Sequence, residues 1–292
     1  MKRSVFVAVA AALVTASDSG AGDPGTPPDA GAPSPSSPAR SQEALAHGVP
    51  SVGSTTYDVV DTMMMSLGSP AGTTELLSVA TATLSVRFRD DPVGLRVNAE
   101  IEDFSGFTRN RASGSTRSLQ SRDARGAMVF VVGSTGGVMS VARPELSRDA
   151  GQLSLFNQLP YDLFPGLPGR VADPGETWSD TVVWYSSAGG METTSTTART
   201  YTLVGDTVVD GLALVAIALS AEVAIGGQGR PGGRATTNSL SGSLTGHLFW
   251  DAESGLLHSA ELMRRLEGRA TMEGRPSTSV RFSGPQRLRR EK

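Results

Sequence analysis

The residues best suited to acid–base or metal chemistry are two histidines in the stretch from Gly242 to Gly268. This stretch reads GSLTGHLFWDAESGLLHSAELMRRLEG, and it places His247 and His258 on either side of a turn, with Glu261 nearby. If the two imidazoles face each other across paired strands, they could bind a metal ion or transfer protons. A register change of one residue decides whether they do. Because a bare pair lacks a third ligand, the sequence favours half-exposed strand positions over a metal or catalytic site.

Other chemical motifs are absent or stand in the wrong context. Gly227 to Gly232 matches G-x-G-x-x-G, but the dinucleotide-binding motif needs a helix directly after it, and here ATTNSLSG leads into a strand. No G-x-S-x-G, H-E-x-x-H or phosphate-loop pattern occurs. Glu100 and Glu102 share a strand face with Arg96 and Asn98, which is typical of a solvated surface. We therefore predict a non-enzymatic protein without a cofactor, and a hydrolase is the least favoured alternative.

Composition narrows the function classes further. The chain has 292 residues, a formal net charge of −3 and no cysteine. No basic field therefore points to nucleic acid. The lack of cysteine removes disulfides, thiolate metal sites and a cysteine nucleophile together.

Large apolar side chains are the more informative candidates for a binding function. Tryptophan and methionine suit a promiscuous apolar site, although large apolar residues on strands more often pack in an ordinary core. The candidate lining residues are Met63, Met65, Phe156, Phe164, Trp178, Trp184 and Trp250.

These side chains are expected to be positioned by β-strands. In the stretch from Gly242 to Gly268, apolar and polar residues alternate with a period of two on both sides of Asp251–Gly255, which predicts a hairpin. The Asp251 carboxylate is expected to accept backbone N–H bonds within that turn, and Gly255 to adopt a positive φ. The same alternation runs through residues 57–67, 76–88, 95–103 and 212–225, so one face of each strand is dry and the other wet.

The centre of the chain differs from the rest. Residues 153–163 (LSLFNQLPYDL) have apolar positions close to helical spacing, and Pro160 is expected to limit the helix to about two turns before it. We expect turns at Val204–Asp206 and a flexible loop at Gly226–Gly233. The predicted fold is all-β: a large curved antiparallel sheet or open half-barrel with one short central helix, with two separate sandwiches as the alternative.

The chain is expected to divide into four parts. Residues 1–16 resemble a secretory signal peptide, with Lys2 and Arg3 before an apolar run and small residues at Val14–Ala16. Residues 17–50 form a disordered tether rich in proline, serine, glycine and alanine, with His47 in or beside it. Residues 51–285 form a single β-rich domain whose two halves join near 150–175. Residues 286–292 form a basic tail.

Two resemblances concern where the protein acts. Val14–Ser17 resembles the lipobox of bacterial lipoproteins, with Ser17 where that family has its lipidated cysteine, so lipidation is not expected. The segments PGLPGRVADPGETWSD, RTYTLVGDTVVDGLALVAI and GHLFWDAESGLL resemble uncharacterised exported β-rich bacterial proteins. More distantly, the strand plan of residues 51–283 resembles the half-barrel of periplasmic lipoprotein carriers, which hold lipid in an apolar cavity capped by helices.

The expected function follows from these resemblances and from the composition. The protein would be exported to the periplasm or cell envelope, with a membrane contact only through an uncleaved signal segment. Its concave face would hold a lipid or another apolar ligand, or contact an envelope protein. The alternative is a structural or assembly protein of the envelope without a small ligand.

Overall fold

A computed structural model describes residues 44–70, 72–147, 149–152, 155–188 and 190–291. The expected signal peptide and residues 17–43 of the expected tether lie outside the described residues. Leu45 and His47, near the end of the expected tether, are buried.

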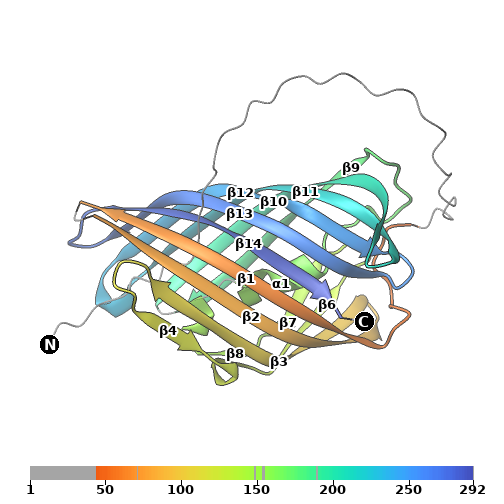
Figure 1. Ribbon diagram of the computed structural model, residues 1–292, viewed down its shortest axis with the longest axis horizontal. Coiled ribbons are helices and arrows are strands. Elements are labelled where there is room, and N and C mark those ends of the chain that lie inside the picture. Colours follow the sequence, from red (N-terminus) through yellow and green to blue (C-terminus); the bar gives the residue numbers. More distant parts are fainter. Residues whose placement is uncertain (1–43, 71, 148, 153–154, 189, 292) are drawn as a thin grey trace, which may run out of the picture.

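Most of the described chain belongs to one antiparallel sheet of twelve strands (Figure 1). Its strands are β1 (Ser54–Ser69), β2 (Gly72–Asp91), β3 (Gly94–Asn110), β4 (Thr116–Leu119), β6 (Ala127–Val132), β7 (Val138–Ala142), β9 (Thr177–Ala188), β10 (Met191–Val209), β11 (Leu212–Gly229), β12 (Thr236–Asp251), β13 (Leu256–Met272) and β14 (Thr278–Arg290). A separate two-stranded ladder pairs β5 (Ala124–Arg125) with β8 (Glu145–Leu146).

The helical elements are few and short. The single α-helix of the described residues is α1 (Leu155–Leu163), and three 3-10 turns accompany it: η1 (Ser121–Asp123), η2 (Ala150–Gln152) and η3 (Pro231–Gly233). The sheet curls around α1 as a half-barrel (Figure 1). The predicted β-dominated class with one short central helix is therefore confirmed, as one sheet rather than two sandwiches.

The order of the strands brings the two ends of the sheet-forming chain together. Along the main path the order is β7-β6-β3-β2-β1-β14-β13-β12-β11-β10-β9, and β4 pairs with β3 beside this path. The first strand, β1, thus pairs with the last, β14, in the middle of the sheet. The free edges are β7 and β9, which flank the connection that carries α1.

Alternation explains which face of each strand is buried. Tyr57, Val59 and Met63 of β1 point into the curl, and the even-numbered apolar residues of β2 do the same. In β3 the pattern starts with Leu95 and changes phase at a register shift, after which Phe104 is buried. The apolar stripe predicted from sequence therefore faces the core, with β-bulges deciding where its phase changes.

The predicted hairpin at Gly242–Gly268 is confirmed in detail. The turn is closed by a bond from the Gly255 N–H to the Asp251 carbonyl at 2.9 Å. The Asp251 carboxylate accepts the N–H groups of Glu253 and Ser254 at 3.1 and 3.3 Å, and Gly255 has φ of 69°. The Asp251 side chain also accepts from Arg290 at 2.5 Å, which ties the turn to β14.

Glycines allow neighbouring strands to approach closely along the curl. A Cβ atom at Gly242 or Gly246 would collide with the carbonyl oxygen of Arg265 or Glu261 on β13, and one at Gly284 would collide with Thr62 on β1. Glycine at such positions permits the local bending that a curled sheet needs.

Several expected boundaries are corrected by the structure. The helix does not end before Pro160 but continues to Leu163. Proline in a helix interior costs about 3 kcal/mol, and the buried side chains of Phe156, Leu159 and Leu163 inside the curl offset that cost. The expected turn at Val204–Asp206 is a bulge inside β10, and the chain reverses instead at Asp210–Gly211, which both have positive φ.

The ends of two strands also extend further than expected. The flexible loop expected at Gly226–Gly233 is shorter, because β11 continues to Gly229. The basic tail expected at 286–292 is instead the end of β14 up to Arg290, paired with β1 on one side and β13 on the other. Composition alone does not show this strand, because its basic residues alternate with residues that are buried once the strand is paired on both sides.

Candidate functional site

The inner face of the half-barrel carries buried polar and charged side chains around α1. On most strands the inner positions are apolar, but β10 presents Ser195, Thr197, Arg199 and Tyr201 there, all buried. Three aspartates, Asp61, Asp162 and Asp180, and a second arginine, Arg264, belong to the same inner region. Buried ionisable groups with direct charge partners are candidates for a functional site.

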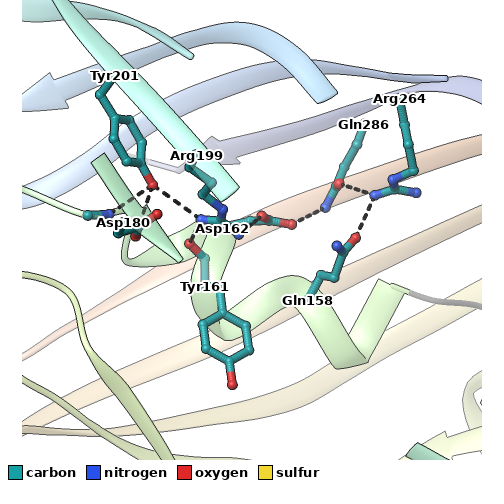
Figure 2. Close-up of polar contacts among 9 residues, drawn as sticks. Gln158, Tyr161, Asp162, Asp180, Arg199, Tyr201, Arg264 and Gln286 are labelled. Carbon is teal, nitrogen blue, oxygen red and sulfur yellow. Dashed lines mark hydrogen bonds and ion pairs between the residues drawn. The ribbon is translucent and has the colours of Figure 1, made fainter. Parts of the chain in front are cut away.

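Arg199 links β10 to the last turn of α1 (Figure 2). One of its terminal nitrogens donates to the Tyr161 carbonyl at 2.9 Å, and the other pairs with the Asp162 carboxylate at 3.2 Å. Arg199 and Asp162 are 2% and 3% exposed, so this ion pair is almost completely removed from water. A guanidinium with two acceptors on one helix holds that helix in a defined position.

A second arginine holds the first half of the helix. Arg264 on β13 donates to the side-chain oxygens of Gln158 at 3.0 Å and Gln286 at 2.9 Å. Gln286 in turn donates to Asp162 at 3.1 Å, so the two arginines belong to one continuous chain of contacts (Figure 2). Asp61 on β1 lies 3.9 Å from Arg264 and completes this end of the network.

Tyr201 carries the network to the edge strand β9. Its hydroxyl donates to Asp180 at 3.3 Å and accepts the N–H of Gly166 at 3.0 Å. The ring stacks on Trp178, whose indole N–H donates to the Gly166 carbonyl at 2.8 Å. The segment that follows α1 is therefore fixed to β9 and β10 by two aromatic side chains.

Burial controls the protonation of the network. It raises the pKa of each of the three carboxyl groups, Asp61, Asp162 and Asp180, while the nearby arginines lower it. Burial also raises the pKa of Tyr201. Three carboxyl groups face two guanidinium groups, so the region disfavours any additional negative charge.

Six of the seven candidate lining residues belong to one hydrophobic cluster or pack against it, and Trp184 is buried outside that cluster. Met63, Phe156, Phe164, Trp184 and Trp250 are buried, and Met65 and Trp178 are partly buried against the core. Phe164 and Trp250 meet around the His47 ring, whose centroid is 5.5 Å from Phe164 and 5.1 Å from Trp250.

The remaining candidates lie around α1 and along β9. The ring centroids of Phe156 and Phe104 are 5.5 Å apart, and the Met63 sulfur lies 4.0 Å from a terminal nitrogen of Arg264. Trp178 and Trp184 lie on β9 beside β10. The proposal that these side chains line a ligand site remains a prediction.

His47, which the sequence analysis placed in or beside the expected tether, is buried. Its Nε2 atom lies 2.8 Å from the Pro165 carbonyl, and burial lowers the pKa of the imidazole from 6.5 to about 4. The ring is therefore neutral at physiological pH. It fastens the chain before β1 to the segment after α1.

The facing pair of His247 and His258 does not form. His247 is opposite Glu261 and exposed, whereas His258 is buried on the other face of its strand. A register shift at Phe249 and Trp250 sets these positions.

Sequence reasoning missed the buried charges, although a signal for them existed. Asp61 stands between Val59 and Met63, and Arg264 stands between Leu262 and Leu266, both in phase with the apolar positions. A charged residue at the apolar phase of a strand indicates either an error of phase or a buried ion pair.

The polar side chains of the inner face hold α1 in place through hydrogen bonds and an ion pair. The Ser195 and Thr197 hydroxyls have no hydrogen-bond partner within the described part of the chain, so no base there activates either one. Among the described residues, no group of three histidine, aspartate or glutamate side chains could hold a metal ion. None of the helices described is long and apolar enough to cross a membrane.

No protein-family model matches this chain, and no match was found among the curated proteins.

Proposed function

We propose that this is an exported, non-enzymatic protein that holds an apolar, lipid-like ligand on the concave side of its half-barrel. The observation that carries the proposal is a curled sheet whose inner positions are apolar on most strands and form one hydrophobic cluster, covered by one helix of nine residues. The resemblance of the strand plan to periplasmic lipoprotein carriers, which use a curved sheet in this way, supports it.

A ligand would take over contacts that α1 makes in this structure. Phe156, Leu159 and Leu163 of α1 are buried inside the curl, and an acyl chain offers the same kind of surface. Methionines such as Met63 and Met65 adapt their shape easily to such an exchange. The helix itself is held by hydrogen bonds from Arg199 and Arg264. These polar contacts do not depend on how closely its apolar side chains pack against the sheet.

Native mass spectrometry of the purified full chain tests this proposal. We expect a bound species that organic extraction releases and that is identified as a lipid. The neutral probe N-phenyl-1-naphthylamine should bind the delipidated protein and be displaced by that lipid. If native mass spectrometry shows no bound species and the protein leaves the fluorescence of the probe unchanged, the proposal is contradicted.

A second candidate function is contact with an envelope protein at the sheet edge. The edge strand β9 exposes Val183 and Tyr185, the latter with 65% of its surface accessible. Exposed apolar side chains on an edge strand favour pairing with another chain. Tyr185→Ser should then abolish capture of an envelope partner without affecting binding of the probe, whereas the ligand-holding function predicts no effect of this variant on either.

Export is part of the proposal and has its own test. Residues 1–16 are expected to be removed, which leaves Ser17 as an unacylated N-terminus. N-terminal sequencing of the mature protein would check this, and an intact Met1 on protein retained in the cytoplasm would overturn it.

A further inference from the structure

A row of buried polar atoms without protein partners lies on the inner face of two neighbouring strands. On β10 these atoms are the Ser195 and Thr197 hydroxyls and the Nε of Arg199. On β9 they are the Trp184 indole nitrogen and one carboxylate oxygen of Asp180. None of the five has a hydrogen-bond partner within the described residues.

The strand register places these side chains next to one another. Ser195 is directly opposite Trp184, and Arg199 is directly opposite Asp180, with Thr197 between the two pairs. Ser195, Thr197 and Arg199 are at most 2% exposed. Buried polar atoms in folded proteins are nearly always hydrogen-bonded, so a contiguous row of unpaired ones points to a missing partner.

The chemistry of the row defines what that partner carries. The indole N–H and the Arg199 Nε–H are donors, the Asp180 oxygen is an acceptor, and the two hydroxyls can do both. Hydroxyl groups match this mixture because each of them donates and accepts. The surroundings are apolar, since Val223 and Ile225 of β11 lie opposite Thr197 and Ser195.

The charges disfavour an anionic head group. Arg199 already forms an ion pair with Asp162 at 3.2 Å, and Asp180 lies in the same network through Tyr201. A carboxylate or phosphate placed on the row would add a negative charge to a buried region that already has more carboxyl groups than guanidinium groups.

We propose that this row (Trp184, Ser195, Thr197, Arg199 and Asp180) is the head-group subsite for an uncharged, hydroxyl-bearing amphipath. The inference rests on the proposed function, because the apolar part of the ligand would occupy the concave face. The hydroxyls of the head group satisfy the row, and the chain packs beside Val223 and Ile225.

The test compares two lipids that differ in their head group. Delipidated full-length protein is loaded with N-phenyl-1-naphthylamine, and displacement is measured with 1-monooleoylglycerol and with methyl oleate. Because each hydrogen bond to a neutral group contributes modestly, the two hydroxyls of the glyceryl group should give about tenfold tighter binding than the methyl ester. Oleate should bind no better than methyl oleate.

Variants locate the preference on the row. In Ser195→Ala/Thr197→Val the preference for 1-monooleoylglycerol should fall to about twofold or less, while the affinity for methyl oleate is retained. Thr194→Ala/Thr200→Val is the matched control, because both threonines lie on the exposed face of the same strand. The double variant on the row removes two unpaired buried hydroxyls, so its thermal midpoint should not fall, which separates loss of recognition from loss of folding.

Each other outcome overturns the inference. Equal binding of the two lipids to the unmodified protein would mean that the row holds ordered water only. A preference that survives in Ser195→Ala/Thr197→Val would place the head group elsewhere, and preferential binding of oleate would mean an anion site. Binding of methyl oleate without a head-group preference would leave the proposed function standing, whereas no displacement by any of the lipids would remove both.

Discussion

Arg199 and Arg264 are buried cations whose removal would leave carboxyl groups without compensation. A buried ion pair adds little stability compared with apolar residues of similar size, but loss of one partner is strongly destabilising. Arg199 has the better-defined geometry, because it contacts both the Tyr161 carbonyl and the Asp162 carboxylate. At the scale of single residues, the position of α1 therefore depends on a few charged side chains.

We expect Arg199→Met to lower the free energy of unfolding by about 3–5 kcal/mol, because Asp162 loses its ion-pair partner inside the protein. Adding Asp162→Asn should recover part of that loss. The matched control is Arg117→Met, which removes an ion pair to Asp149 from a side chain that is 67% exposed and should cost less than about 1 kcal/mol. Urea unfolding curves give all three values, and an Arg199→Met protein as stable as the control would contradict the expectation.

His47 predicts a dependence of stability on pH. Its pKa is lowered to about 4 by burial in the folded protein, against 6.5 when it is solvated. The unfolded chain therefore binds the proton more readily, so this residue favours folding above pH 6.5 and loses that contribution as the pH falls towards 4. A difference of this size corresponds to an upper limit of about 3 kcal/mol.

The measurement is unfolding free energy at pH 7 and pH 5, in the unmodified protein and in His47→Gln. The buried carboxyl groups Asp61, Asp162 and Asp180 have raised pKa values and act in the opposite direction. They are shared by both proteins, so the difference between the two slopes isolates His47. Parallel slopes would show that the imidazole is accessible to protons in the folded state.

At the scale of elements, the hairpin of β12 and β13 depends on one backbone conformation. Gly255 has φ of 69°, and a Cβ atom there would meet no neighbouring atom. Strain in the backbone is therefore the only cost of a larger residue, and Gly255→Val should destabilise by about 1–2 kcal/mol. Gly53→Val is the comparison, since that glycine has equally open surroundings without a positive φ. Thermal melts check both, and equal midpoints would refute the assignment.

Trp250 near the end of β12 distinguishes a structural from a binding role. It is 2% exposed and packs against His47, so Trp250→Ala should cost about 3–5 kcal/mol through lost burial and a cavity. Val208→Ala, at an exposed position of β10, should change stability by less than about 0.5 kcal/mol. Denaturant melts and fluorescence of the bound probe are measured together. A small stability loss with abolished probe binding would instead place Trp250 in direct contact with the ligand.

At the scale of the whole molecule, β14 joins the two halves of the sheet. It pairs with β1 on one side and β13 on the other, and its last residues include the buried Gln286 and Leu288. The edges of the half-barrel approach each other elsewhere, where Arg143 after β7 donates to the Tyr185 carbonyl of β9 at 3.0 Å. The curl is thus completed by contacts between residues far apart in the chain.

Deletion of residues 286–292 should lower the thermal midpoint by at least about 10 °C, because it removes buried side chains and pairs on both sides of a central strand. Deletion of residues 20–40 is the comparison. Its composition has little apolar surface to bury, so the midpoint should stay within about 2 °C. Circular dichroism melts of both proteins check the difference, and a minor effect of the C-terminal deletion would show that β14 ends before residue 286.

The amino-acid sequence by itself determined the features that depend on neighbours in the chain. Alternation with a period of two depends only on local strand geometry, so it predicted the strands, their buried faces and the half-barrel class. The turn at Asp251–Gly255 is likewise built from its own residues. The reversal at Asp210–Gly211 was available in the same way, because Asp-Gly is a common hairpin signal.

Only the tertiary structure decided the features that depend on residues distant in the chain. Bulges changed the phase of β3 and β13 and separated His247 from His258, and pairing with β1 turned an expected basic tail into a central strand. The row on β9 and β10 likewise becomes contiguous only through strand pairing. The inner network could not be predicted for the same reason, because Asp162, Gln286 and Arg264 come from separate elements. Whether a charged residue at an apolar phase is tolerated depends on a partner that folding brings to it.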